Sequence, residues 1–163
     1  MKKYKKFFKN KKVLITGDTG FKGSWLALWM SLLGARVTGL SNKVPTSPSH
    51  FKAINLKKKI NHINADICNL SILKKIITKK KPDYIFHLAA QSLVKNSFDD
   101  PINTLKTNTL GTINILEALR KSKRNKQCVA IIITSDKCYE NLAISRGYHE
   151  EDRLGGKDPY SGS

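Results

Sequence analysis

Short apolar runs alternate with amphipathic segments along this chain. The runs are rich in aliphatic and β-branched residues and predict strands at Val13–Thr16, Ala35–Leu40, Asn61–Ala65, Tyr84–Leu88 and Val129–Thr134. The last run is continuously apolar, which predicts a central strand buried on both faces. Strands that alternate with helical segments are typical of a parallel sheet with crossover helices. The predicted fold class is therefore α/β, with a Rossmann-like, doubly wound parallel sheet in three layers.

The segments between these runs carry apolar residues at helical spacing. One predicted helix contains Trp25, Leu28, Trp29, Leu32 and Leu33 and stops at Gly34, a short amphipathic piece spans Phe51–Leu56, and longer helices cover Leu70–Lys81 and Ile102–Arg120. The apolar residues of the longest helix lie on more than one of its faces. We therefore expect the sheet to cover one side and a second subunit to be able to cover the other. From Ser135 to Ser163 the chain is expected to be irregular.

Composition and charge narrow the class of protein. The 163 residues are 40% hydrophobic and 26% charged, which suits one globular domain and excludes a disordered chain. Thirty Lys and Arg against 12 Asp and Glu give a net charge of +18, but seven of the lysines crowd into residues 1–12. We therefore expect a solvated basic tail over 1–12 and one domain over 13–163. Lysine, which outnumbers arginine here, is the less common residue in base recognition, so no nucleic acid is expected as partner, although a basic nucleic-acid binder remains an alternative.

Two further function classes are not indicated. No apolar run approaches the length of a membrane span, so no membrane partner is expected. Cys68, Cys128 and Cys138 are an odd number without a CxxC pair, so neither a disulfide framework nor a metal site is predicted. This cysteine usage fits a reducing cytoplasm.

A glycine-rich turn follows the first predicted strand and opens the first predicted helix. Thr16 to Gly23 read TGxxGxxG. In this setting Gly17 makes the tight turn, Gly20 lets a pyrophosphate approach the backbone, and Gly23 lets helix and strand pack closely. The helix N-terminus offers N–H groups to the phosphates. The cofactor-binding residues expected here are Gly17, Thr19, Gly20, Phe21, Lys22 and Gly23.

The glycine spacing, and several later segments in the same order, resemble the extended short-chain dehydrogenase/reductase superfamily, that is, the NAD-dependent epimerase/dehydratase family. The resemblance implies that Asp66 and Ile67, at the end of the third strand, meet the adenine. It also implies that Leu88, Ala89 and Ala90, in the segment HLAAQ, lie along the dinucleotide. Asn108, in TNTLGT, is expected to bond backbone inside its helix. Taken alone, Asp66 is a turn or capping residue and His87 a satisfied core histidine.

The choice between NAD and NADP is open from the residues alone. The second strand of such a sheet usually ends in an acidic residue that holds the ribose of NAD, but no Asp or Glu occurs between Asp18 and Asp66. Lys43 could favour a 2′-phosphate instead. The resemblance implies NAD.

A closer resemblance, over nearly the whole chain, is to the CDP-glucose 4,6-dehydratases. It rests on segments that look like this family's own, at 20–26, 45–48, 134–141 and 152–160. The segment TSDKCYEN at 134–141 is the most specific, because the related dTDP-glucose dehydratases carry Asp-Glu at positions 136 and 137. Asp18 departs from the pattern, in which His is expected. We expect its carboxylate to lie near the pyrophosphate and to weaken cofactor binding.

This resemblance implies a reaction and its residues. CDP-glucose would be oxidised at C4, lose water from C5 and C6, and regain the hydride at C6. Tyr160 would be the base for the 4-hydroxyl and would also bind the cofactor, while Ser135 would bond that hydroxyl. Asp136 would protonate the leaving 6-hydroxyl, and Lys137 would remove the C5 proton. A tyrosine with an ordinary pKa of about 10 needs a nearby cation for this role.

The family's YxxxK pattern places that cation one residue after Ser163. A whole enzyme would also need the last sheet strands and a substrate domain, so we expect the 163 residues to be a cofactor-binding portion that is inactive alone. The full-length protein would form a homodimer or a dimer-based oligomer through the long helix and the helix that starts near Tyr160. The alternatives are another NAD(P)-dependent nucleotide-sugar epimerase, dehydratase or reductase, and a non-catalytic dinucleotide-binding module.

Overall fold

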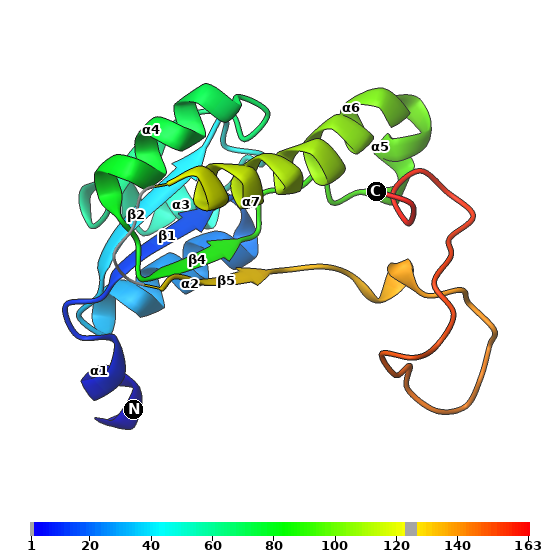
Figure 1. Cartoon of the computed structure of the whole chain (residues 1–163), viewed down its shortest axis with the longest axis horizontal. Helices are drawn as coiled ribbons and strands as arrows, with labels where there is room; N and C mark the ends of the chain where they lie inside the picture. Colours follow the sequence, from blue (N-terminus) through cyan, green and yellow to red (C-terminus); the bar gives the residue numbers. More distant parts are fainter. Residues whose placement is uncertain (1, 123–126) are drawn as a thin grey trace.

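Five parallel strands form the centre of the molecule (Figure 1). The structure is a computed structural model that describes residues 2–122 and 127–163. The strands are β1 (Lys12–Thr16), β2 (Arg36–Ser41), β3 (Asn61–Asn64), β4 (Tyr84–His87) and β5 (Val129–Ile132). Their order in the sheet is β3-β2-β1-β4-β5. All neighbouring pairs are parallel, so the predicted doubly wound sheet is confirmed.

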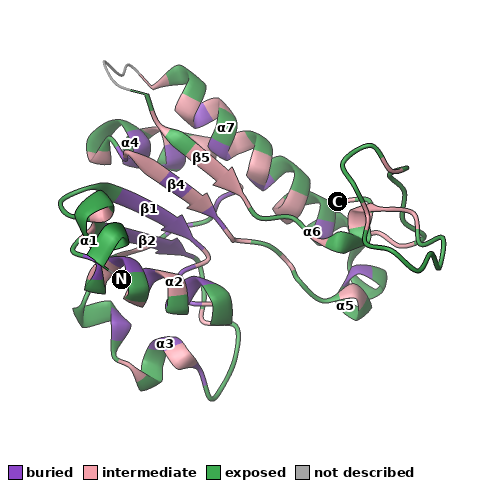
Figure 2. Ribbon diagram, turned by 90° about the horizontal axis from the view of Figure 1, so that it is seen from below, coloured by how far each residue is buried: buried purple, intermediate pink, exposed green. Residues whose placement is uncertain are grey.

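Helices cover both faces of the sheet. They are α1 (Lys2–Phe8), α2 (Phe21–Leu32), α3 (His50–Ala53), α4 (Leu70–Lys80), α5 (Val94–Asp99), α6 (Pro101–Leu105) and α7 (Gly111–Lys121), with short or widened turns η1 (Leu56–Lys58), η2 (Lys106–Leu110) and η3 (Asp136–Cys138). In Figures 1 and 2, α4 and α7 lie on one side of the strands and α2 on the other. The result is the predicted three-layer arrangement.

Alternate residues of β1 point into two separate hydrophobic cores. Leu14 packs with residues of α4 and α7, such as Leu73 and Ile115. Its neighbours Val13 and Ile15 pack on the other face with residues of α2 and α3. This alternation is expected of a strand that has helices on both sides. Burying one such aliphatic side chain completely stabilises the folded state by about 1.5–3 kcal/mol relative to leaving it exposed.

The helix boundaries follow local signals in the sequence. The side chain of Asn69 caps α4 by accepting a hydrogen bond from the amide of Ile72 at 3.1 Å. The helix ends at Lys81, which has a left-handed backbone with φ of 48° and is followed by Pro82. Gly34, with φ of 83°, follows α2 in the same way and confirms the predicted stop.

The N-terminal segment differs from the prediction of a solvated tail. Within the described part of residues 1–12, which excludes Met1, Lys2–Phe8 form the helix α1. Its lysines are exposed, but its aromatic residues have partners: the ring of Tyr4 meets Trp29 at 6.0 Å and that of Phe8 meets Tyr84 at 5.5 Å. Aromatic contacts therefore hold this basic segment against the domain.

The side of α2 that faces the core also differs from expectation. Its small and flexible residues are buried, including Ala27 and Met30. Trp25, Trp29 and Leu32 are 51%, 44% and 67% exposed. The helical spacing located the helix correctly, and Leu33 and Leu28 of the predicted set do contact the core. The rest of the buried face is made of smaller or more flexible residues, because small side chains allow helix and sheet to approach more closely.

The long predicted helix is continuous in backbone conformation but widens at η2. One side is covered by the sheet and α4, through Ile115 and Ala118. The other side carries exposed Leu105, Ile113 and Leu116. Within the described residues, then, only one of the two expected sides is covered.

The prediction that Val129–Thr134 is a central strand is wrong for the described chain. β5 is an outer strand, since it pairs only with β4 within residues 2–122 and 127–163. Val129 and Ile133 are 51% and 44% exposed, because an apolar strand is buried on both faces only when helices cover both. Beyond Ser135 the chain is irregular apart from η3 and one antiparallel bridge between Tyr139 and Leu154, as predicted. No helix in the described ranges combines the length and apolar character needed to cross a bilayer.

Candidate functional site

The carboxyl ends of the strands meet at one edge of the sheet. Thr16 pairs with Leu40 of β2 and His87 of β4, so the loops that leave these strands start side by side. The order of the chain reverses between β1 and β4. In open parallel sheets, ligands bind at this reversal, outside the carboxyl ends of the strands.

The glycine turn after β1 brings the start of α2 to this point. Gly17 has φ of 75°, a conformation that favours glycine, and its carbonyl accepts the amide of Gly20 at 3.0 Å. Gly20 precedes α2 without a side-chain cap. The amide of Ser24 makes the first helical bond, to the carbonyl of Gly20 at 2.9 Å. The preceding amides of the first turn have no acceptor within the helix and offer donors and a partial positive charge to an anion.

Gly23 is required by close packing inside the turn. A Cβ atom built on it would lie 2.0 Å from the carbonyl oxygen of Gly17. At Gly20 the same atom would lie 3.3 Å from that oxygen, which is tight but not a clash. The geometry therefore supports the packing role predicted for Gly23 and leaves Gly20 as the position that keeps the backbone open to a ligand.

A buried hydrogen-bond chain holds the turn to the loop after β4. The hydroxyl oxygen of Thr16 accepts the amides of Leu88 and Ala89, both at 3.2 Å, and lies 2.6 Å from Nδ1 of His87. The Thr112 hydroxyl donates to the carbonyl of Asn108 at 2.6 Å, so it accepts from Nε2 of His87 at 3.1 Å. Nδ1 is then the acceptor of the Thr16 proton.

His87 is 2% exposed, and its burial lowers the pKa of the imidazole to about 4. It is a neutral, satisfied core residue, as expected from the residues alone.

The segment expected to lie along a dinucleotide, Leu88–Ala90, runs from β4 past the glycine turn. Asn108 fixes the next residue, Gln91: its side chain accepts the Gln91 amide at 2.8 Å and donates to the Gln91 carbonyl at 3.1 Å. It also donates to the hydroxyl of Ser163 at 2.8 Å. Asn108 thus bonds backbone of a different segment, and the expectation that it bonds within its own helix is wrong, because the wide turn η2 directs its side chain toward the loop.

Asp66 and Ile67 follow β3 at the same edge of the sheet. The amide of Cys68 donates to Asp66 at 2.8 Å, and this bond lowers the pKa of the carboxyl below its usual range. Asp66 is therefore a turn residue, while Asn69 is the helix cap. Ile67 is buried and its side chain occupies the space over Gly111, where a Cβ atom would lie 2.4 Å away. The glycine of the TNTLGT segment thus makes room for this isoleucine.

Asp18 lies elsewhere than expected. Its carboxylate is fully buried and accepts the hydroxyl of Ser41 at 2.6 Å, while its second oxygen lies 2.7 Å from Nδ1 of His62. A Cβ atom on Gly39 would lie 2.1 Å from the same carboxylate. The expectation that Asp18 puts a charge near the pyrophosphate is wrong, because the side chain turns under β2 into space that Gly39 leaves free.

The remaining residues of the turn have distinct surroundings. Thr19 is 5% exposed, and its hydroxyl donates to the carbonyl of Lys43 at 2.6 Å, which joins the turn to the loop after β2. Phe21 and Lys22 are exposed at the start of α2. Trp25, one turn later, stacks on the ring of His50 with a centroid distance of 4.1 Å. Thr19 therefore acts on the loop through its hydroxyl, while Phe21 and Lys22 are accessible.

The expected catalytic residues lie on the irregular part of the chain. Ser135 caps η3: its hydroxyl accepts the amide of Lys137 at 3.3 Å and donates to Asp136 at 3.1 Å. Tyr160 is held through its backbone, with its amide donating to Asp158 at 3.0 Å and its carbonyl accepting the Ser163 hydroxyl at 2.7 Å. Hydrogen bonds from Ser161 lower the pKa of Asp158, and the charge of Lys137 contributes to the same shift. The two segments are therefore close enough to interact electrostatically.

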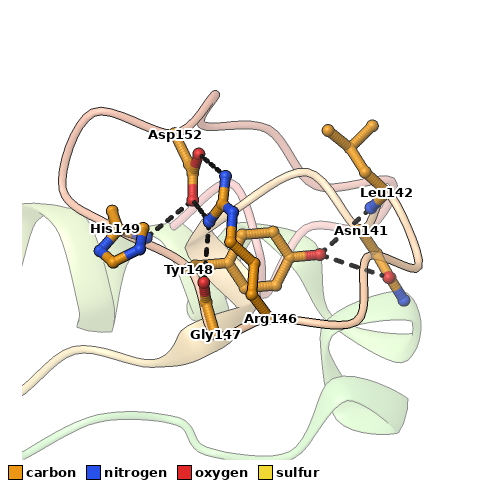
Figure 3. A network of polar contacts seen from close by, with 7 residues as sticks. All are labelled: Asn141, Leu142, Arg146, Gly147, Tyr148, His149 and Asp152. Carbon is orange, nitrogen blue, oxygen red and sulfur yellow. Dashed lines mark hydrogen bonds and ion pairs between the residues drawn. The ribbon is translucent and has the colours of Figure 1, made fainter.

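A polar network orders the chain between these two segments (Figure 3). Arg146 donates two hydrogen bonds to Asp152, both 2.7 Å, and the amide of His149 donates to the same carboxylate at 2.7 Å. These bonds hold the pKa of Asp152 well below its usual range, with the guanidinium contributing most. The hydroxyl of Tyr148 accepts the amide of Leu142 at 3.1 Å, and its ring stacks on Tyr139 at 5.1 Å. Residues 141–152 thus form an ordered loop outside the sheet.

Several residues that shape the site were not anticipated. Ser41 and His62, the partners of Asp18, and Gly39 and Gly111, which make room for neighbours, were missed. A glycine inside a predicted strand was the available signal for Gly39, because such a glycine often marks the close approach of another group. In the described part of the chain, no cluster of three or more His, Cys, Asp or Glu side chains could hold a metal ion.

Comparison with known proteins is consistent with this geometry. Residues 14–163 match the model of the family described as GDP-mannose 4,6 dehydratase. The chain belongs to this dehydratase family. Within it, the chain is 43% identical to a CDP-glucose 4,6-dehydratase of Salmonella typhimurium over 98% of its own length and 44% of that relative. The predicted resemblance to the CDP-glucose dehydratases is confirmed.

Solved structures agree with the assignment to the dehydratase family and its epimerase relatives. An epimerase of Methanothermobacter thermautotrophicus is 30% identical with a TM-score of 0.79, over 98% of this chain and 46% of that one. A UDP-glucose 4-epimerase of Thermus thermophilus in complex with NAD is 26% identical with a TM-score of 0.79, over 93% of this chain and 46% of that one. The chain therefore spans less than half the length of these relatives.

Proposed function

We propose that this chain is the cofactor-binding portion of a nucleotide-sugar dehydratase that converts CDP-glucose into CDP-4-keto-6-deoxyglucose with NAD. The observation that carries the proposal is the bare backbone at Gly20, where α2 starts beside the β4 loop at the reversal of the sheet. The identity of 43% to a CDP-glucose 4,6-dehydratase supports the substrate. In this proposal, residues 13–163 form the dinucleotide-binding domain and 1–12 a basic N-terminal segment.

The residues present fit a dinucleotide. Gly23 keeps the turn close to the strand, and no side chain at Gly20 stands between the first amides of α2 and a pyrophosphate. Gly17, Thr19, Phe21 and Lys22 would complete the turn, with Asp66 and Ile67 at the adenine and Leu88 to Ala90 along the dinucleotide. When bound, NAD would accept a hydride from C4 of the sugar and return it to C6.

The chain's own residues would move the protons. Tyr160 would remove the proton of the 4-hydroxyl, which Ser135 would orient by a hydrogen bond. Lys137 would take the proton at C5, which the neighbouring ketone acidifies, and Asp136 would protonate the 6-hydroxyl as it leaves as water. Ser135 bonds Asp136 and Lys137 within one turn, which supports their acting together. A neutral lysine is required for this step, and burial by bound substrate would favour it.

The remaining parts of the proposal concern assembly and location. The exposed residues Ile102, Leu105, Ile113 and Leu116 on α6 and α7 support a homodimer formed through this helix. An odd number of cysteines without a CxxC pair supports a cytoplasmic location. The match covers only 44% of the CDP-glucose 4,6-dehydratase relative, which supports our expectation that the 163 residues alone do not turn over substrate.

Titration calorimetry with NAD tests the cofactor part of the proposal. We expect the chain to bind NAD, and Gly20→Val to abolish binding while the protein keeps its circular dichroism spectrum, because the added carbons occupy the phosphate position. Gly147→Val is the matched control, since a Cβ atom there has no neighbour within 4 Å. A well-folded chain that takes up no NAD, or a Gly20→Val variant that binds as tightly as the parent, contradicts the proposal.

An activity assay tests the reaction. We expect no conversion of CDP-glucose by the 163 residues, and conversion once the chain is fused to the C-terminal part of the Salmonella typhimurium relative. In that fusion, Lys137→Ala and Tyr160→Phe should each lower kcat by at least about a hundredfold. NAD binding without turnover in the fusion would favour the non-catalytic module instead.

A further inference from the structure

A cavity lies at the amino ends of the strands, on the opposite edge of the sheet from the glycine turn. Its volume is about 620 Å³, which is within the range of small-molecule sites. It is lined by the first residues of three strands, Lys12, Arg36 and Asn61, and by residues of η1 and of the last turn of α4. The strand arrows in Figure 1 start at this edge and point away from it. The cavity is therefore separate from the surface that would receive a dinucleotide.

Six cationic side chains surround this cavity, and they come from four different elements. They are Lys12, Arg36, Lys58, Lys59, Lys79 and Lys80. Among the described lining residues none is acidic. Within residues 2–122 and 127–163, no ion pair joins any of the six to a carboxylate. The carboxylate of Asp83, close in sequence to the cavity, accepts the backbone amide of Lys12 at 2.8 Å. The repulsion among the cations is therefore not offset by a paired carboxylate, and an anion in the cavity would relieve it.

Helix chemistry explains only two of these cations. Lys79 and Lys80 lie in the last turn of α4, where positive charge interacts favourably with the carbonyl end of the helix. Strands have only small net dipoles, so the same reason does not apply to Lys12 and Arg36 at the starts of β1 and β2. A shared anionic ligand accounts for both pairs.

A buried hydroxyl in the cavity wall supports the same conclusion. Thr38 of β2 lines the cavity and is only 8% exposed. Its hydroxyl makes no hydrogen bond to any residue that the structure describes. Buried hydroxyls usually have a partner, because burial removes them from water. A phosphate oxygen in the cavity would accept the proton of this hydroxyl.

We propose that this cavity binds a compact polyanion that carries several phosphate groups in a chain. Arg36 would bind two phosphate oxygens at once, the lysines would contact the others, and Thr38 would donate its hydroxyl proton. Cations gathered from four elements around one hollow favour a small ligand over a nucleic acid, which is bound along an extended stripe of charge. The inference goes beyond the proposed function, because no residue of the glycine turn takes part in it.

Titration calorimetry of the whole chain with tripolyphosphate tests the proposal. NAD is present in excess, so that the probe does not compete for the glycine turn. We expect one tripolyphosphate to bind per chain at an ionic strength of about 0.15 M. The double variant Arg36→Gln and Lys80→Gln should weaken binding by at least about tenfold, because two charge-assisted hydrogen bonds are lost. Thr38→Val keeps the shape and the charge of the cavity wall and should weaken binding by at least about threefold.

The matched control is the double variant Lys75→Gln and Lys95→Gln. Both lysines are exposed and neither lines the cavity, so the chain loses the same charge elsewhere. This control should keep the parent affinity within about twofold. If it weakens binding as much as the Arg36 and Lys80 variant does, the attraction is diffuse and the proposal fails. If Thr38→Val binds as tightly as the parent, the phosphates do not enter the cavity, and the proposal fails as well.

Further probes identify the source of the phosphates. Tighter binding of ATP than of tripolyphosphate indicates a nucleotide, and equal or weaker binding indicates a free oligophosphate; both results support the site if Thr38→Val weakens them. A short RNA duplex that binds more tightly than either probe, and that the same variants weaken, would assign the surface to nucleic acid and overturn the proposal. Absence of tripolyphosphate binding to folded chain also overturns it and leaves the proposed function intact, since NAD binding is measured separately. The urea midpoint of each variant shows whether it is folded.

Discussion

Nε2 of His87 lies 3.1 Å from the hydroxyl oxygen of Thr112, and this hydroxyl donates a hydrogen bond to the carbonyl of Asn108 at 2.6 Å. The ring therefore joins β4 to the long helix, while its other nitrogen reaches β1 through Thr16. A protonated imidazole would have two donors and would lose the acceptor that Thr16 requires. The arrangement thus favours the neutral ring in the folded protein.

The stability of the fold should fall in mild acid because of His87. Its folded pKa is about 4, against an ordinary value of 6.5. Between pH 6.5 and about pH 4, the imidazole of His87 is protonated in the unfolded chain and neutral in the folded chain. The free energy of unfolding therefore keeps its full value above pH 6.5 and falls by about 3 kcal/mol as the pH drops from 6.5 to about 4.

Urea unfolding at pH 7 and pH 4 measures this loss. His87→Gln should lose less stability between the two values than the parent does, since it cannot titrate. His149→Gln, at an exposed position, should follow the parent. Parallel pH profiles for the parent and His87→Gln would show that the folded ring titrates normally.

Gly23→Ala should destabilise the domain. The new methyl group would lie 2.0 Å from the carbonyl oxygen of Gly17, so helix and strand must separate. We expect a loss of about 1–3 kcal/mol in the free energy of unfolding. Gly147→Ala adds the same atom in open space and should leave the urea midpoint within error. Equal stability of the two variants would mean that the turn has room which the structure does not show.

Removing the imidazole beside Asp18 should destabilise the end of β2. His62→Leu leaves the fully buried carboxylate with the hydroxyl of Ser41 as its remaining side-chain partner among the described residues. We expect a loss of about 1–3 kcal/mol, because a buried acceptor loses a hydrogen bond. The double variant Asp18→Asn and His62→Leu replaces the buried carboxylate with a neutral amide and should recover part of the lost stability. A double variant less stable than His62→Leu would contradict this account.

The Arg146 and Asp152 pair should control local order and leave global stability unchanged. The pair lies on the loop outside the sheet, and Arg146 is exposed (Figure 3). Arg146→Ala should leave the urea midpoint unchanged and speed trypsin cleavage at Arg153, since the loop loses its bidentate contact. Lys157→Ala, outside this network, serves as the control. Unchanged cleavage of Arg146→Ala would show that the remaining hydrogen bonds suffice to order the loop.

Strand positions and the glycine turn were predictable because they depend on local patterns. An aliphatic run at Val13–Thr16 and three spaced glycines after it leave few alternatives for the backbone. Which face of α2 packs on the sheet was not predictable in the same way. Ala27 and Trp29 each belong to a set of apolar residues at helical spacing. The distance between helix and sheet decides that the smaller residue is the buried one.

The candidate site was predictable only in part, since long-range contacts define the rest. Nothing near Asp18 in the sequence indicates that its carboxylate would be hydrogen-bonded by His62, 44 residues later. The exposure of Val129 depends on which segments flank β5, which an apolar run cannot show. The roles of Ser135, Asp136, Lys137 and Tyr160 remain predictions.

The Thr16 hydroxyl has a consequence for how a ligand is received. It accepts the amides of Leu88 and Ala89 while its own strand runs into the glycine turn, so one buried oxygen sets the separation of the two loops. A dinucleotide arriving between them would meet a preorganised receptor and would have little main-chain entropy to remove. Association at this end should accordingly resemble the docking of rigid bodies.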